Sequence, residues 1–143
     1  EIRDKEGLTP LIRAAYWGMA GVVTALMIGG ADVEARDSHG WTALSVAAYW
    51  GKSQCVHALL YPKDPKLSAN IETADDQGRT PLLIAMTNGR ANVTRMLHAA
   101  GASEEAVRRY IDRHQLRNPG YDFAAEIENP FSDIYSAVDD HSH

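Results

Sequence analysis

The residue types able to do catalytic or metal chemistry are scattered along this 143-residue chain. Of its six histidines, only His141 and His143 stand close together, and they lie in a polar terminus. The single cysteine, Cys55, is expected to be a buried apolar residue. The sequence holds no phosphate-binding loop, no Cys-x-x-Cys pair and no nucleophile elbow. We therefore expect no enzyme activity, no metal site and no cofactor.

Aromatic side chains point to a different chemistry, the non-covalent recognition of a partner. The dipeptide Tyr-Trp occurs twice, as Tyr16-Trp17 and Tyr49-Trp50, and the third tryptophan of the chain is Trp41. Tyr and Trp dominate the energetic hot spots of protein interfaces. These five side chains are candidates for a binding surface, provided that the fold brings them together.

The C-terminal segment, residues 118–143, carries two short motifs. Asn129-Pro130-Phe131 resembles the motif bound by EH domains of endocytic adaptors, and Tyr135 opens a stretch that resembles a tyrosine-based sorting signal. Matches of this length arise often by chance. The competing interpretation is structural, because Asn129 followed by Pro130 is typical of the first residues of a helix.

The elements that must position these side chains follow from an internal repeat. Residues 4–18 match residues 37–51 at a shift of 33, and a third copy begins at Asp75, a further 38 residues along the chain. The five additional residues are placed between Lys63 and Leu67, because the shift is still 33 at Leu60 and has become 38 at Ala69. In-phase repetition with this period predicts a solenoid of stacked units.

Each copy predicts a protruding turn followed by two helices. A glycine closes the turn, and the threonine two residues later caps the first helix, so three threonines are expected to be equivalent helix starts: Thr9, Thr42 and Thr80. The first helix of each copy ends at a glycine: Gly18, Gly51 and Gly89. A second apolar helix follows each glycine. Pro62 and Pro65 predict that the second helix of the middle copy ends near Tyr61, before a longer loop.

The sequence resembles the ankyrin-repeat family over residues 1 to about 103. The family pattern Asp-x-x-Gly-x-Thr-Pro-Leu, Ala-Ala, Gly, Val-Val, Leu-Leu, Gly-Ala-Asp-Val-Asn-Ala is met almost throughout the first copy, which ends Gly30-Ala31-Asp32-Val33-Glu34-Ala35. The resemblance implies an all-α solenoid of helix-turn-helix units with protruding β-turn or hairpin loops. One departure concerns the family's histidine after Thr-Pro-Leu, which ties neighbouring repeats and is replaced here by Ile12, Ser45 and Leu83.

The chain is expected to divide into a repeat stack, residues 1–117, and an acidic tail, residues 118–143. The repeats are expected at about 4–36, 37–74 and 75–103, followed by a capping helix at about 104–116. Ser103 would start that helix, with Glu104 and Glu105 in its first turn, where acidic side chains suit the helix dipole. The chain starts inside a turn and has no initiator Met, so we expect a fragment of a larger protein.

The family's architecture also implies where a partner would bind. Residues just before the glycine that ends the first helix, and those around the Asp-x-x-Gly turn, point into a concave groove. The expected partner-binding set is therefore Leu8, Tyr16, Trp17, His39, Trp41, Tyr49, Trp50, Gln77, Arg79 and Asn88. The alternative is that the large aromatics pack between repeats. Thr87 and Asn88 replace the aromatic pair in the third copy, so the groove should become polar there.

Charge and hydropathy limit the class of partner. Residues 1–117 sum to +1 and residues 118–143 to −6, a net charge of −5. Neutralising phosphates needs a basic face that survives this summation, so we expect no nucleic-acid binding. The 18 uncharged residues from Ala14 to Ala31 contain four glycines and divide into two predicted helices, so we expect no direct membrane insertion. A lone cysteine fits a reducing compartment, and we expect an intracellular, cytoplasmic protein.

The expected function is protein–protein interaction, with a partner protein or peptide bound in the concave aromatic groove. One alternative is a regulatory or targeting region of a larger enzyme or membrane-trafficking protein, with adaptor-binding motifs in the tail. Another is a structural spacer. We also expect the tail to dock on an ankyrin surface, its own or a neighbour's, because it combines acidic charge with apolar side chains. The capping helix offers opposite charge at Arg108, Arg109, Arg113 and Arg117.

Overall fold

The structure, a computed structural model, describes residues 7–113 of the chain. Its elements are α1 (Pro10–Tyr16), α2 (Ala20–Ile28), α3 (Ala43–Trp50), α4 (Ser53–Leu60), the 3₁₀ helix η1 (Pro65–Leu67), α5 (Pro81–Thr87), α6 (Ala91–Ala99) and α7 (Glu105–Arg113). The described residues form no strand. The predicted all-α class is therefore confirmed, and the loops that project from the stack have no strand pairing within this range.

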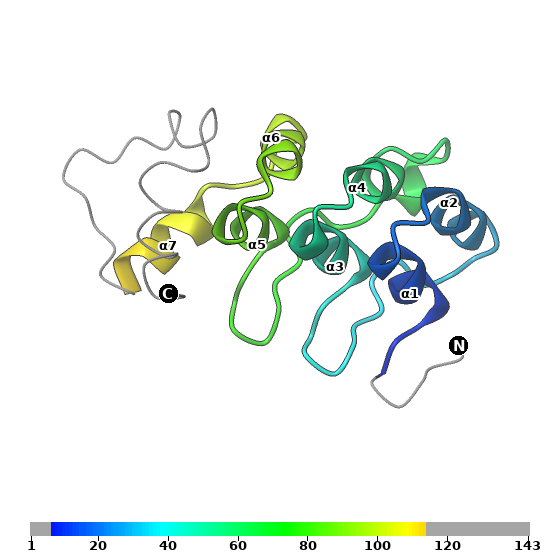
Figure 1. The fold of residues 1–143 in the computed structure, drawn as a ribbon, viewed down its shortest axis with the longest axis horizontal. Coiled ribbons are helices and arrows are strands. Elements are labelled where there is room, and N and C mark those ends of the chain that lie inside the picture. Colours follow the sequence, from blue (N-terminus) through cyan, green and yellow to red (C-terminus); the bar gives the residue numbers. More distant parts are fainter. Residues whose placement is uncertain (1–6, 114–143) are drawn as a thin grey trace.

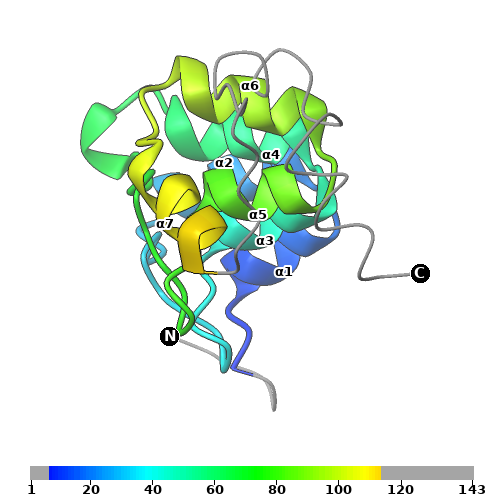
Figure 2. The same ribbon diagram turned by 90° about the vertical axis from the view of Figure 1, so that its left-hand side faces the viewer.

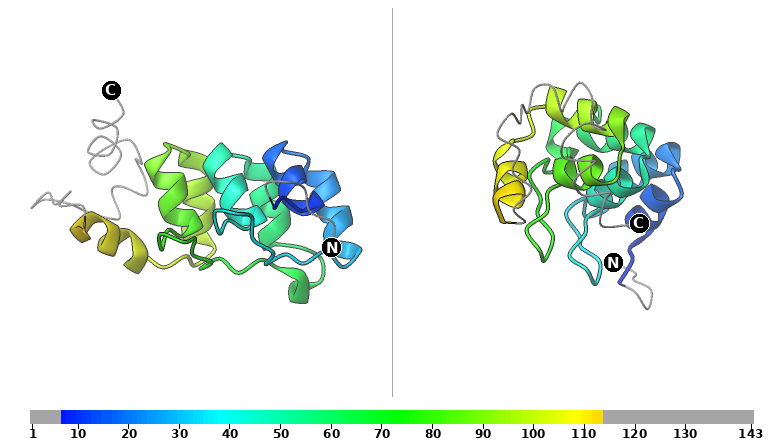
Figure 3. Two further views of the ribbon diagram at one scale, coloured as in Figure 1. Left: turned by 90° about the horizontal axis from the view of Figure 1, so that it is seen from below. Right: turned by 60° about the vertical axis from the view of Figure 1, so that its left-hand side comes forward.

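The helices form two layers. Figure 1 shows α1, α3 and α5 side by side in one layer and α2, α4 and α6 in a second, and each helix packs on its neighbour in the same layer. Figure 2 looks along the stack, so the helices of each layer lie one behind another. The extended loops before α3 and α5 project on the same side of the first layer (Figure 3). This is the arrangement that a repeat of 33 residues predicts.

Three threonines start the helices of the first layer, as predicted. The hydroxyl oxygens of Thr9, Thr42 and Thr80 accept hydrogen bonds from the backbone N–H three residues later, at 3.2, 3.4 and 3.4 Å. The backbone of each threonine is extended, with ψ between 164° and 173°. Each hydroxyl thus satisfies one of the N–H groups that a helix start leaves without a partner.

A glycine in the left-handed region ends each first-layer helix. At Gly51, φ is 68°, and the next N–H, that of Lys52, bonds back to the carbonyl of Ala47 at 2.8 Å. A Cβ at Gly51 would also lie 2.9 Å from Cδ of Arg90, the residue directly before α6. Both the backbone conformation and the close approach therefore require glycine there.

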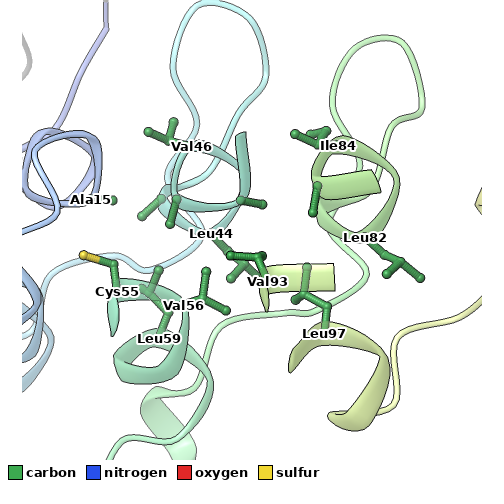
Figure 4. Packing of buried hydrophobic residues seen from close by; sticks show 14 of the residues in the cluster. Ala15, Leu44, Val46, Cys55, Val56, Leu59, Leu82, Ile84, Val93 and Leu97 are labelled. Carbon is green, nitrogen blue, oxygen red and sulfur yellow. The ribbon is translucent and has the colours of Figure 1, made fainter. Parts of the chain in front are cut away.

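The hydrophobic core lies between the two layers. Figure 4 shows Leu44 and Leu82 of the first layer meeting Leu59 and Leu97 of the second, and all four are fully buried. The Cys55 thiol is buried in the same region, as expected. Burial raises its pKa, while the charge of Lys52 acts in the opposite direction, so the thiol is protonated at neutral pH.

The remaining elements follow the sequence closely. α4 ends at Leu60 with Tyr61 as its C-cap, which confirms the predicted end. η1 lies in the inserted loop. α7 packs against α5, and the Ser103 hydroxyl accepts a hydrogen bond from the N–H of Glu105 at 3.1 Å. No helix within residues 7–113 is long and apolar enough to span a bilayer. The tail motifs at Asn129-Pro130-Phe131 and Tyr135 lie outside the described residues.

Candidate functional site

A hollow of about 340 Å³ opens on the first helical layer. Its walls come from α1, α3 and the turns that precede α1, α3 and α5. We call it the aromatic groove and define it by its lining residues: Leu8, Ile12, Tyr16, Asp37, Ser38, His39, Trp41, Val46, Trp50 and Arg79. Tyr16 and Trp50 remain 41% and 42% exposed, while Ile12 and Val46 are buried beneath them. The hollow therefore has an apolar floor and accessible aromatic walls.

Five aromatic rings form a continuous chain along this surface. Neighbouring ring centroids are separated by 5.2 Å from Trp17 to Tyr16, 5.3 Å from Tyr16 to Trp50, 5.0 Å from Trp50 to Tyr49, and 5.1 Å from Tyr49 to Trp41. The first three pairs meet edge to face, the arrangement that the aromatic quadrupole favours. Each ring therefore packs on at least one other ring of the chain.

Trp41 joins the second and third repeats at one end of the groove. Its indole N–H donates to a carboxylate oxygen of Asp75 at 2.8 Å, and its ring lies 5.7 Å from the guanidinium carbon of Arg79. Arg79 in turn forms an ion pair with Asp75 at 2.8 Å. Trp41 is half-buried, so its side chain has a structural role beside its place in the groove wall.

Asp75 is the most strongly held acidic group of the site, with a side chain only 1% exposed. Burial alone would raise its pKa. Hydrogen bonds from the Arg79 N–H, the Trp41 indole, the Gln77 N–H and the Arg79 guanidinium outweigh burial, so the pKa of Asp75 lies below its ordinary value. The carboxylate is therefore charged and fully engaged at neutral pH, and it fixes the turn before α5.

Two arginines, at other positions, link neighbouring repeats in this chain, which lacks the family's histidine. Arg36 donates from its guanidinium to the carbonyl oxygens of Gly40 and Ala74 and, at 3.1 Å, to the hydroxyl of Thr73. Arg90 donates from Nε to the carbonyl oxygen of Tyr49 at 2.8 Å. These contacts bridge successive repeats: Arg36 bonds the turns before α3 and α5, and Arg90 bonds the last turn of α3.

The structure brings six of the ten predicted binding residues together in the aromatic groove: Leu8, Tyr16, His39, Trp41, Trp50 and Arg79. Tyr49 lies half-buried between Trp41 and Trp50, as a support for the wall. This arrangement combines two expectations that the sequence offered as alternatives, since Trp50 packs on Tyr16 of the preceding repeat and also lines the hollow.

The other three predicted residues lie elsewhere. Trp17 is 66% exposed and lines a separate hollow of about 280 Å³ beside Lys52. Gln77 lines a third hollow, next to α7. Asn88 caps its own helix, because its amide donates to the carbonyl oxygen of Ile84 at 2.8 Å. The set predicted as one groove therefore spreads over three hollows and a helix end.

Four residues of the groove were absent from the predicted set: Ile12, Asp37, Ser38 and Val46. Two of them carry a signal that the sequence does contain. Ile12 stands four residues before Tyr16, and Val46 four before Trp50, so each pair shares one face of a helix. Among the residues that the structure describes, no three His, Cys, Asp or Glu side chains are grouped so as to hold a metal ion.

Comparison with known proteins supports the same architecture. A family model described as ankyrin repeats, in three copies, matches residues 11–108. A comparison with curated proteins gives no match. The matched range includes both helices of every repeat seen here, except for the first residue of α1, and reaches into α7. The chain belongs to the ankyrin-repeat family, whose repeats generally act as protein–protein interaction modules.

Proposed function

We propose that this chain recognises a segment of a partner protein or peptide and holds it in the aromatic groove. The observation that carries the proposal is the row of aromatic rings in which each ring packs on the next and three, Tyr16, Trp41 and Trp50, line the hollow. Tyr16 and Trp50 stay about two-fifths exposed, and the apolar side chains of Ile12 and Val46 are buried. Exposed aromatic clusters on a rigid scaffold are typical of interaction sites.

The groove's chemistry favours an extended segment with a large apolar side chain. Such a side chain would enter between Tyr16 and Trp50 and cover Ile12 and Val46, with Arg79 and His39 available to polar groups beside it. In the third repeat Thr87 and Asn88 replace the aromatic pair, and their side chains bond to carbonyl groups of α5. Specificity for an apolar anchor is therefore assigned to the first two repeats.

A spacer function does not account for this surface, because a spacer gains nothing from exposed tryptophans. The proposal also places the chain in the cytoplasm, with a single buried thiol as its supporting feature. The catalytic or trafficking activity of a larger protein would be separate from this groove, which would then supply docking.

Peptides selected from a display library against the full chain would test the proposal by NMR. The three indole N–H signals report on three places: Trp50 in the groove wall, Trp41 at its end, and Trp17 outside it. We expect bound peptides to shift the Trp50 and Trp41 signals, with a smaller change at Trp17. Selected peptides that shift only Trp17, or none of the three signals, would contradict groove binding.

A further inference from the structure

We propose that the aromatic groove is occupied, in the isolated chain, by the chain's own acidic tail, residues 118–143. The inference rests on the proposed function, because it names the segment that the same groove would hold. The tail would then block the groove of its own molecule, and another protein would have to displace the tail before it could bind there.

Three cations lie in the groove or beside it. Arg79 lines the groove, Lys52 lies in the hollow beside Trp17, and Arg90 lies in the hollow of about 310 Å³ beside Trp50. The charge of Arg79 is paired with Asp75, and the Asp37 carboxylate in the groove wall accepts hydrogen bonds from the backbone of His39 and Trp41. A ligand along this surface would therefore meet positive charge beside Trp17 and Trp50, from Lys52 and Arg90.

The tail has the complementary composition. Residues 118–143 hold six acidic residues and no lysine or arginine. Large apolar side chains are interspersed among these acids, at Tyr121, Phe123, Ile127, Phe131, Ile134, Tyr135 and Val138. Opposite charge would steer the tail toward the groove. The apolar side chains of the tail would then pack against the aromatic walls.

The tail is long enough to reach the groove of its own molecule. Three stacked repeats at a helix spacing of 8–10 Å span roughly 30 Å. Phe131 lies 18 residues beyond Arg113, the last residue of α7, and that length of chain can extend to about 60 Å. Tethering also gives the tail an effective concentration of the order of millimolar, so modest intrinsic affinity would suffice.

Two other surfaces fit the tail less well. The hollow beside α7, about 460 Å³, is nearer, but its walls include Glu72 and Glu105, and its cation Arg109 is already 3.8 Å from Glu105. The exposed face of α2 offers apolar Val22 and Ile28 without a charged residue in the helix. Neither surface combines several aromatic walls with neighbouring cations such as Lys52 and Arg90.

A spin-labelled tail would test the inference in the full chain. A nitroxide is attached at Ser136→Cys, next to Tyr135, while Cys55 is fully buried and should stay unlabelled. We expect the oxidised label to remove at least half of the intensity of the Trp50 and Trp41 indole signals, relative to the reduced label. The backbone amide of Arg95, on the exposed side of α6, should keep its intensity.

Two further measurements check the mechanism and the stoichiometry. Replacing both Phe131 and Tyr135 with Ala in the labelled chain should restore the indole signals, and so should raising the salt from 0.1 to 1 M, where the Debye length falls from about 10 to about 3 Å. Full indole intensity with the oxidised label would overturn the inference. Signal loss that disappears on dilution would also contradict it, since the tail would then occupy a second copy.

The outcomes separate this inference from the proposed function. If display peptides bind with Trp50 and Trp41 shifts while the tail label leaves those signals unchanged, the groove binds partners but the tail is not its occupant. If neither the peptides nor the tail affect the two indoles, both proposals are wrong.

Discussion

Single residues fix the position of the groove walls, and Asp75 is one of them. The Asp75 carboxylate gathers donors from two repeats, so the position of Trp41 depends on a buried charge. A buried acceptor that loses a donor keeps its desolvation penalty, which costs about 1–3 kcal/mol. The aromatic wall and the stability of the stack are therefore coupled at this residue.

Replacing Trp41 with Phe should destabilise the fold by about 1–2 kcal/mol, because the phenyl ring keeps most of the packing but leaves Asp75 without the indole donor. Urea unfolding followed by circular dichroism measures this. Trp17→Phe is the matched control, since Trp17 is mainly exposed and should change stability little. Equal stability of the two variants would show that the bond contributes nothing.

Asp75 should also make stability depend on pH. Its pKa is lowered in the folded state, so the stability it adds is present above the unfolded pKa, about 3.9, and is lost as pH falls through the folded value. Asp75→Asn should be less stable than the parent at neutral pH, and the difference should shrink as pH falls below about 4. A difference in unfolding free energy between the parent and Asp75→Asn that stays constant across this pH range would contradict the account.

Thr94 offers the opposite case, a buried polar group that the fold does not use. Within the described chain its hydroxyl is buried and has no hydrogen-bond partner, and Val23 and Val56 occupy the equivalent positions of the other repeats. Thr94→Val should stabilise the protein by about 1 kcal/mol. Thr87→Val is the control, because the Thr87 hydroxyl bonds to the Leu83 carbonyl at 3.0 Å and its loss should not stabilise. A destabilised Thr94→Val variant would show that the hydroxyl is satisfied.

At the scale of elements, the turns depend on side chains from neighbouring repeats. Arg36 joins its own turn to the next one through three acceptors, and a lysine cannot make this planar set of bonds. Arg36→Lys should therefore speed amide hydrogen exchange at residues 37–41 and 73–75, as measured by mass spectrometry. Arg95→Lys, which replaces an exposed residue bonded only within α6, is the control. Unchanged exchange in Arg36→Lys would assign turn rigidity to other contacts.

Helix starts and ends could be predicted because local chemistry decides them. A threonine two residues after a turn glycine needs only its own neighbours to cap a helix, and all three such sites behave alike. The groove could be predicted only in part, because its membership depends on contacts between repeats. Trp50 packs on Tyr16 of the preceding repeat, whereas Trp17, at the equivalent sequence position, has no such ring before it among the described residues.

At the scale of the whole molecule, the stack provides a rigid frame, and the first two repeats carry the aromatic surface. Sequence periodicity was sufficient for the frame, since stacking uses the same buried positions in each unit. It could not separate the groove from the hollows beside it, because Trp17 and Trp50 occupy equivalent repeat positions and yet line different hollows. The cross-repeat bonds of Trp41 and Arg36 also have no signature in the spacing of residues.

The central claim is that the aromatic groove binds a partner segment, and matched tryptophan variants test it most directly. The measurement is the affinity of one display-selected peptide for Trp50→Ala and Trp17→Ala, by calorimetry. The two residues occupy equivalent repeat positions, but only Trp50 lines the groove. A hot spot worth about 2 kcal/mol predicts about 30-fold weaker binding for Trp50→Ala. We expect a much smaller loss for Trp17→Ala; parent-like affinity of Trp50→Ala would contradict the account.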